Sequence, residues 1–169
     1  MKAKLIIEDK EIEVEISEEE YKKLQLSEEK KTGYERVPKN GHYFYEFGKG
    51  DVESDVEDCY DIDNEYYESA NYYSSETVAE NNARADKLMR QLRRFSVEHR
   101  GRGVDFNSTE TAKHYIYYDC IHDELKTVFT FYAKTFGTIL FDSEETAQAA
   151  IDKFRDELIW YFTEYKDSL

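Results

Sequence analysis

The feature that most constrains the fold is an amphipathic pattern over residues 75–99. Steps of three and four separate the residues of one stripe, namely Val78, Asn81, Ala85, Leu88, Leu92, Phe95 and His99. This spacing places side chains on one face of an α-helix. The pattern therefore predicts one long helix, with Ser74 or Ser75 as its N-cap. Because Leu88, Leu92 and Phe95 are too apolar to face water, we expect it to be the main core helix, packed under a sheet.

The same helix is basic, whereas the segment before it is acidic. Away from the stripe lie cationic residues: Arg84, Lys87, Arg90, Arg93 and Arg94, then Arg100 and Arg102. Residues 46–68 contain ten carboxylates and one lysine, and the 169-residue chain has a formal net charge of −15. Such a charge repels nucleic acid and anionic membranes and attracts basic surfaces. Solubility alone is the simpler reason for the charge.

Composition indicates a folded, soluble protein. Hydrophobic residues make up 40% of the chain, and there are 15 Tyr and 10 Phe but only one Pro, which argues against disorder. No apolar run has the length of a signal segment or a membrane span. Cys59 and Cys120 stand in no metal-ligand spacing, so we expect reduced thiols in a cytosolic protein, although one disulfide stays open.

Strand and helix patterns predict an α+β fold, in which antiparallel β meanders pack on two main helices. Residues 2–7 and 11–16 predict a hairpin, and a capping box over residues 17–20 predicts a short helix after it. We expect this ββα element to occupy residues 1–26 and the main domain to occupy residues 34–169.

The main domain should contain short strands around its two helices. The runs that predict strands are residues 42–47, 51–57, 66–73, 114–119, 124–132 and 136–141. A turn is expected at Asp63 and Asn64, and Gly101, with positive φ, should end the central helix. Ser143 should cap the last helix, whose apolar face begins at Ala147.

Two joints in the chain are alike. Residues 72–79 and 140–147 both run from a strand through a Ser N-cap and an acidic first turn into a helix. An internal duplication of a strands-then-helix unit accounts for this. Convergence on good capping accounts for it equally, because acidic residues in a first turn favour the helix dipole.

The acidic segment has the pattern of a binding surface. Residues 51–57 alternate, so Asp51, Glu53, Asp55 and Glu57 should form a ladder on one strand face, with carboxylates about 6.6–6.8 Å apart. This is near the contour spacing of phosphates on a DNA strand. Tyr adds contact area with few rotors. The expected contact residues are Asp51, Glu53, Asp55, Glu57, Asp58, Tyr60, Asp61, Asp63, Glu65, Tyr66 and Tyr67. A nucleic-acid mimic has this pattern, and so does an ordinary acidic hairpin.

No catalytic or metal motif is apparent. The four histidines lie in separate predicted elements. Asp61, Asp63 and Glu65 resemble the start of a calcium loop, but Tyr66 and Tyr72 stand where that loop needs Gly and Glu. We therefore expect a protein that is not an enzyme and has no metal site and no cofactor.

The basic helix allows a second function. A small anionic, nucleotide-like ligand could be sequestered by its arginines: Arg84, Arg90, Arg93, Arg94 and Arg102. This requires a concave site beside aromatic residues. The arginines could instead form a solvated face, or pair with the acidic segment of the same molecule or of a second copy.

Four segments resemble a family of small proteins encoded by phages and prophages of Gram-positive bacteria. They are residues 69–79, 92–99, 114–119 and 136–151, and the resemblance covers roughly residues 33–165. The family's usual glycine before Asn-Tyr is Ala70 here. The family carries no established activity, so no functional residues transfer. The resemblance implies a phage accessory protein in the host cytoplasm, a setting in which small acidic proteins often block host defence or DNA-handling proteins.

Together these features predict a non-enzymatic phage inhibitor. Its partner is expected to be a host protein with a basic, nucleic-acid-binding surface, such as a nuclease or CRISPR effector, bound partly by imitating nucleic acid. We expect no direct binding to nucleic acid or membranes. The sequence leaves self-association open.

Overall fold

The computed structural model describes the backbone of residues 2–7, 10–19 and 31–169, and the side chains of residues 15–19 and 31–169. The chain forms two compact units, Met1–Thr32 and Gly33–Leu169. Among the described residues, no helix combines the length and the apolar character needed to cross a membrane.

The first unit contains the predicted hairpin. Strand β1 (Lys2–Ile7) pairs antiparallel with strand β2 (Lys10–Glu15), with Leu5 opposite Ile12. A helix begins at Glu18, but most of the predicted short helix lies outside the described residues, as do Asp9 of the turn and Glu20 of the capping box.

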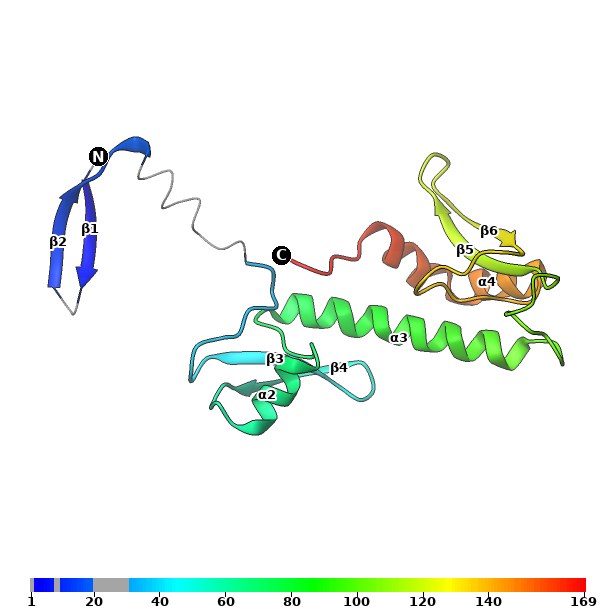
Figure 1. Ribbon diagram of the computed structural model, residues 1–169, viewed down its shortest axis with the longest axis horizontal. Coiled ribbons are helices and arrows are strands. Elements are labelled where there is room, and N and C mark those ends of the chain that lie inside the picture. The colour runs from blue at the N-terminus through cyan, green and yellow to red at the C-terminus, as the bar shows by residue number, and fades with distance from the viewer. Residues whose placement is uncertain (1, 8–9, 20–30) are drawn as a thin grey trace. The chain divides into compact units, whose positions relative to one another are not determined.

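The second unit has the predicted α+β class, with two antiparallel hairpins and three helices (Figure 1). Its elements in order are β3 (His42–Phe47), β4 (Asp51–Val56), α2 (Asp61–Glu68), α3 (Glu76–His99), β5 (Lys113–Asp119), β6 (Glu124–Thr130) and α4 (Glu144–Thr163). Strand β3 pairs with β4, and β5 pairs with β6. Helix α3 contacts β3, β4 and α4, and α4 also contacts β5 and β6.

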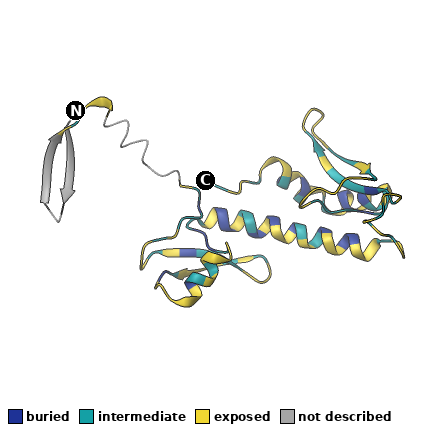
Figure 2. Ribbon diagram, viewed as in Figure 1, coloured by how far each residue is buried: buried dark blue, intermediate teal, exposed yellow. Residues whose placement is uncertain are grey.

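Helix α3 is the predicted central helix. Ser75 is its N-cap, and the Ser75 hydroxyl accepts a hydrogen bond from the Val78 N–H at 3.5 Å. The buried face follows the helix axis (Figure 2). Its predicted members Val78, Ala85, Leu88, Leu92 and Phe95 are buried, whereas Asn81 is only partly buried and His99, the last member, is exposed.

Two hydrophobic clusters hold the unit together, and both include α3. Near its N-terminus, Val78 and Ala79 pack with Tyr73 under Phe44 and Val52 of the first hairpin. The second cluster, between α3 and α4, contains Leu88, Leu92, Phe95, Phe141, Ala147, Ala150, Ile151 and Leu158. The core therefore lies along one helix rather than under one continuous sheet.

The two halves of the second unit share a layout. After each hairpin the chain returns to the first strand through an isolated bridge, from Tyr73 to Phe44 and from Phe141 to His114. A Ser-capped helix follows each bridge, and the Ser143 hydroxyl accepts from the Thr146 N–H at 3.1 Å. The layout is compatible with duplication and with convergence, so duplication stays a prediction.

Four sequence predictions of local structure are wrong. Residues 66–73 are not a strand, and Asp63 and Asn64 are not a turn, because α2 occupies Asp61–Glu68. Residues 136–141 are not a third strand and contribute only the Phe141 bridge. Gly101 lacks a positive φ. Arg100 ends α3 in an extended conformation, and the Gly101 N–H donates to Asp142 Oδ2 at 2.6 Å.

Candidate protein-binding surface

The first hairpin has two different faces. Phe44 and Val52 point toward α3 and join its apolar cluster. On the opposite face, Tyr45 stacks on Tyr66 of α2, with ring centroids 4.4 Å apart. Helices α2 and α3 therefore cover opposite faces of the hairpin (Figure 1). The acidic residues of β4 that alternate with Val52 lie on the α2 side.

Glu57 anchors the end of this hairpin from inside. Its side chain is only 1% exposed and accepts two hydrogen bonds from the Arg36 guanidinium, at 2.8 and 2.9 Å. The Tyr72 hydroxyl and the Cys59 N–H each donate to it at 2.9 Å. The bonds from Arg36 lower the pKa of Glu57 from 4.5 to about 2. The predicted ladder of four exposed carboxylates is therefore wrong at Glu57, which is held in the interior.

Asp63 is the second buried carboxylate of the predicted surface. It is 2% exposed and accepts from the Tyr43 hydroxyl at 2.9 Å. The Tyr60 N–H at 2.9 Å and the Asp58 N–H at 3.1 Å also donate to it. Burial raises the pKa of Tyr43, and its bond to Asp63 raises it further. Because Asp63 binds N–H groups at the start of α2, it fixes that helix on the hairpin.

The other predicted contact residues are exposed, apart from Tyr66. Tyr66 is half-buried against Tyr43 and Tyr45 and supports the surface. The side chains that remain at the surface are Asp51, Glu53, Asp55, Asp58, Tyr60, Asp61, Glu65 and Tyr67. We call this set the acidic face. Within the described part of the chain none of its six carboxylates forms an ion pair, although the Tyr45 hydroxyl donates to Glu53 at 3.1 Å.

The aromatic residues of the acidic face differ in their attachment. Tyr60 is 68% exposed, and Tyr67 is 43% exposed with the Arg36 guanidinium 5.4 Å from its ring centroid. Ile62, at 47% exposure, lies between them in sequence and was not predicted as a contact. The acidic face thus places exposed aromatic side chains, a type enriched at protein interfaces, beside carboxylates that form no ion pair with the described residues.

Sequence reasoning missed the residues that support this face. Arg36 lies 21 positions from Glu57 in the sequence, and Tyr72 lies 15 positions from it. No local sequence pattern indicates hydrogen bonds over such separations. Asp63 did carry a local signal, because carboxylates in a first turn favour helices. The sequence instead predicted a turn at Asp63 and Asn64, and a strand over the Tyr-rich residues 66–73 that follow.

The predicted arginine site does not converge on one point. Arg84 binds Glu157 of α4 at 2.8 Å and stacks 3.9 Å over Trp160. Arg90 binds Glu46 of β3 at 2.7 Å, and Arg94 lies 3.8 Å from Glu98. Arg93 and Arg102 are exposed. Among the described residues, the basic helix therefore forms an ion pair with Glu46 of the acidic segment and with no carboxylate of the acidic face.

A shallow hollow nevertheless gathers cations from two elements. It measures about 300 Å³ and lies between the β3–β4 turn and α3. Its lining residues are Gly48, Lys49, Lys87, Arg90, Gln91 and Arg94, and we call it the basic hollow. The turn sits close to α3, since a Cβ at Gly50 would lie 3.1 Å from Lys87 Cδ. Lys49 and Lys87 were not in the predicted set, and Arg93 and Arg102 do not line the hollow.

One cluster of metal-type ligands occurs in the described part of the chain, at Asp119, His122 and Glu124. The Lys126 ammonium lies 2.7 Å from Asp119 and 2.6 Å from Glu124. A cation of the protein itself therefore already occupies the space between these carboxylates. Both cysteines, Cys59 and Cys120, are free and exposed.

Comparisons with known proteins supply no relative. No family model matches the chain, and neither a curated protein nor a solved structure matches it. The resemblance to phage proteins over residues 33–165 thus stays an expectation. The surfaces themselves are the basis on which a function can be proposed.

Proposed function

We propose that this protein is a non-enzymatic phage accessory protein that binds and inhibits a host defence or DNA-handling protein through the acidic face. The observation that carries the proposal is the set of six exposed carboxylates without ion pairs in the described chain, beside exposed Tyr60 and Tyr67. The partner is a host protein whose basic surface normally binds nucleic acid.

The support under the acidic face favours binding without refolding. Glu57 and Asp63 tie the end of β4 and the start of α2 to Arg36, Tyr72 and Tyr43. A surface fixed in this way loses little conformational entropy when a partner docks. Its charge speeds encounter with a basic partner, and its tyrosines supply the contact area.

The imitation of nucleic acid rests on the spacing in β4. Asp51, Glu53 and Asp55 are exposed on one face of a regular strand, so their spacing is about 6.6–6.8 Å. Glu57 does not extend this row, because its side chain turns inward. The row is therefore short, and Asp58, Asp61 and Glu65 around α2 supply the remaining charge.

The test compares two variants that remove equal charge. In the first, Asp51, Glu53 and Asp55 are changed to Ser; in the control, Glu144, Asp152 and Asp156 of α4, also exposed, are changed to Ser. Pull-downs from a Gram-positive host lysate, followed by mass spectrometry, identify the partner. Its affinity and its nucleic-acid-binding activity are then titrated with each purified variant.

We expect the first variant to lose binding and inhibition and the control to keep most of both. Affinity should fall as salt rises, because exposed charge pairs are screened. Full inhibition by the first variant would contradict the proposal, and so would a titration without salt dependence.

A second candidate function is sequestration of a small anionic, nucleotide-like ligand, and the basic hollow favours it. Lys49, Lys87 and Arg94 line the hollow. Lys49 and Lys87 form no ion pair with any described residue, whereas Arg94 lies near Glu98. Thermal-shift screening against pyrophosphate, cyclic dinucleotides and ADP-ribose tests it, since a ligand at 100 times its Kd adds about 2.7 kcal/mol. Lys87→Ala should abolish a genuine shift and Arg93→Ala should not. No shift with any of these probes would remove this candidate.

A further inference from the structure

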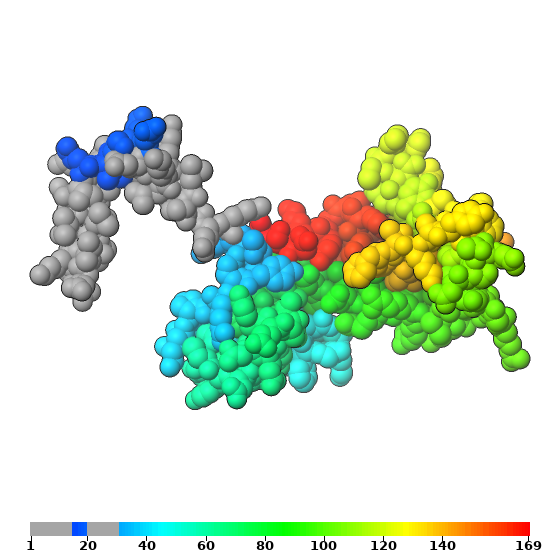
Figure 3. Space-filling model, in the orientation of Figure 1, coloured from blue at the N-terminus to red at the C-terminus, as the bar shows by residue number. Residues whose placement is uncertain are grey.

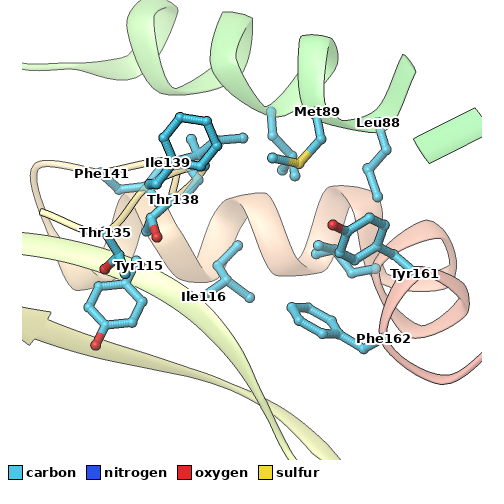
Figure 4. A pocket seen from close by; sticks show the side chains of 14 residues that line it. Leu88, Met89, Tyr115, Ile116, Thr135, Thr138, Ile139, Phe141, Tyr161 and Phe162 are labelled. Atoms are coloured by element: carbon cyan, nitrogen blue, oxygen red, sulfur yellow. The ribbon is translucent and has the colours of Figure 1, made fainter. Parts of the chain in front are cut away.

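The second half of the unit contains an open apolar groove between α3, β5 and α4. It measures about 500 Å³, and none of its lining residues is charged. Leu88 and Met89 of α3 form one wall and Ile116 of β5 faces them, with Phe162 of α4 at one end (Figure 4). In a chain with 36% charged residues, an uncharged hollow of this size is a notable exception. Apolar hollows of this volume are typical binding sites.

Phe136 stands at the rim of this groove and is fully exposed, with a relative accessibility of 106%. A hydrogen bond from the Thr138 N–H to the Thr135 carbonyl, at 3.2 Å, closes a turn around it. Gly137, with φ of 78°, occupies the third position of that turn, where a type II turn requires a positive φ. The turn thus holds Phe136 outward, on a segment that lies at the surface between β6 and α4 (Figure 3).

We infer that two copies of this chain associate around a twofold axis, each inserting Phe136 into the apolar groove of the other. A twofold interface must be self-complementary. Here one chain supplies both parts side by side, a protruding aromatic ring and an uncharged hollow. A second copy therefore offers an occupant, an exposed aromatic ring, whose apolar character matches the groove.

The contact area argues for a weak dimer. An aromatic side chain buries about 150–250 Å². Counting both surfaces, two insertions bury roughly 800 Å², against about 1,200–2,000 Å² for a standard stable interface. Tyr132, which is 85% exposed on the same segment, can add to the area. We therefore expect a weak, reversible dimer rather than a permanent one.

Salt should strengthen this association. The groove has no charged lining residue, while each copy has a formal net charge of −15. Added salt screens the repulsion between copies and leaves apolar contacts intact. Binding through the acidic face should show the opposite dependence, so failure of one proposal does not imply failure of the other.

The test is sedimentation equilibrium of the full chain from about 1 μM to about 1 mM, a range that spans weak, reversible dimerisation. We expect a monomer–dimer equilibrium that shifts toward dimer at higher salt. Phe136→Ser should weaken dimerisation at least about tenfold and leave the circular dichroism spectrum unchanged, because the side chain is exposed. Phe47→Ser, at another exposed Phe (58%), is the matched control and should dimerise normally.

A mixing experiment tests the insertion itself. Met89→Arg places a charge in the groove wall and should also give a monomer. A mixture of Met89→Arg and Phe136→Ser copies retains one intact groove and one intact Phe136. It should therefore form a heterodimer more readily than either variant alone forms a dimer. A wild-type chain that stays monomeric throughout, or a Phe136→Ser variant that dimerises like wild type, overturns the inference.

Discussion

The two hairpins of the second unit start from similar sequences and reach different environments. His42-Tyr-Phe-Tyr45 begins β3, and His114-Tyr-Ile-Tyr117 lies at the start of β5. On the face away from the hydrophobic core, Tyr43 is completely buried under α2 and hydrogen-bonded to Asp63. Tyr115, at the corresponding position of β5, is only partly buried, and Tyr117 two residues on is 36% exposed.

The segment between each hairpin and its helix causes this difference. After β4 the chain forms α2, which covers the outer face and brings Asp63 under Tyr43. After β6, residues 131–140 form no helix and present Phe136 at the rim of the apolar groove. The same layout thus supports a polar, hydrogen-bonded core in one half and an apolar core with an open groove in the other. Each proposal depends on one of these two halves.

The largest expected effect is in the apolar half. Phe95 is 5% exposed, and its ring meets Phe154 edge-on at 5.8 Å. Phe95→Ala should lower the free energy of unfolding by about 3–5 kcal/mol, because it leaves a cavity in the core. Urea denaturation measures this. Val97→Ala on the exposed side of the same helix is the control, expected within about 0.5 kcal/mol. Equal effects of the two changes would show that α3 is not the core helix of this half.

The second largest effect is expected from acidification, which should lower the stability that Glu57 gives to the polar half. The pKa of Glu57 is lowered to about 2 in the folded state, so its stabilisation is complete above 4.5 and is lost as the pH falls from there through about 2. The depression corresponds to roughly 3 kcal/mol. The stability difference between wild type and Glu57→Gln should therefore shrink as the pH falls from about 4.5 toward 2. A difference that stays constant over this range would contradict the assigned network.

A paired substitution compares the tyrosines of the two hairpins directly. Tyr43→Phe removes a hydrogen bond to a buried carboxylate and should cost about 1.5–3 kcal/mol. Tyr115→Phe, one residue after His114 as Tyr43 follows His42, should stay within about 0.5 kcal/mol, since Tyr115 is only partly buried. Thermal and chemical unfolding report both. Similar costs would mean that α2 does not distinguish the two hairpins.

The smallest expected effect concerns the contact between α3 and the first hairpin. A double-mutant cycle for Arg90→Ala and Glu46→Gln should give a coupling of about 0.2–1 kcal/mol, as for other surface ion pairs. Arg94→Ala alone should stay within about 0.5 kcal/mol. The same cycle between Arg90 and Glu53 should give no coupling. Coupling there would mean that the basic helix already engages the acidic face, and the proposed binding function would be lost.

The sequence by itself determined the elements whose signals are local. The stripe of α3, the Ser75 and Ser143 caps and the alternation in β4 all act over a few residues. Such patterns specify helices, strands and the α+β class because each buries one face of a single element. They also located the exposed carboxylates Asp51, Glu53 and Asp55.

Only the tertiary structure decided which carboxylates are exposed and which of the two hairpins has its outer face covered by a helix. The alternation of residues 51–57 predicted that Glu57 is exposed, but hydrogen bonds from Arg36 and Tyr72 hold it in the interior. A turn was predicted at Asp63 and Asn64 and a strand over residues 66–73, whereas the segment forms α2 and its Asp63 and Tyr66 contact Tyr43. Burying a carboxylate is tolerated only where hydrogen-bond donors surround it. The side-chain donors, Arg36, Tyr72 and Tyr43, lie at least 15 positions away along the chain, so local sequence could not report them.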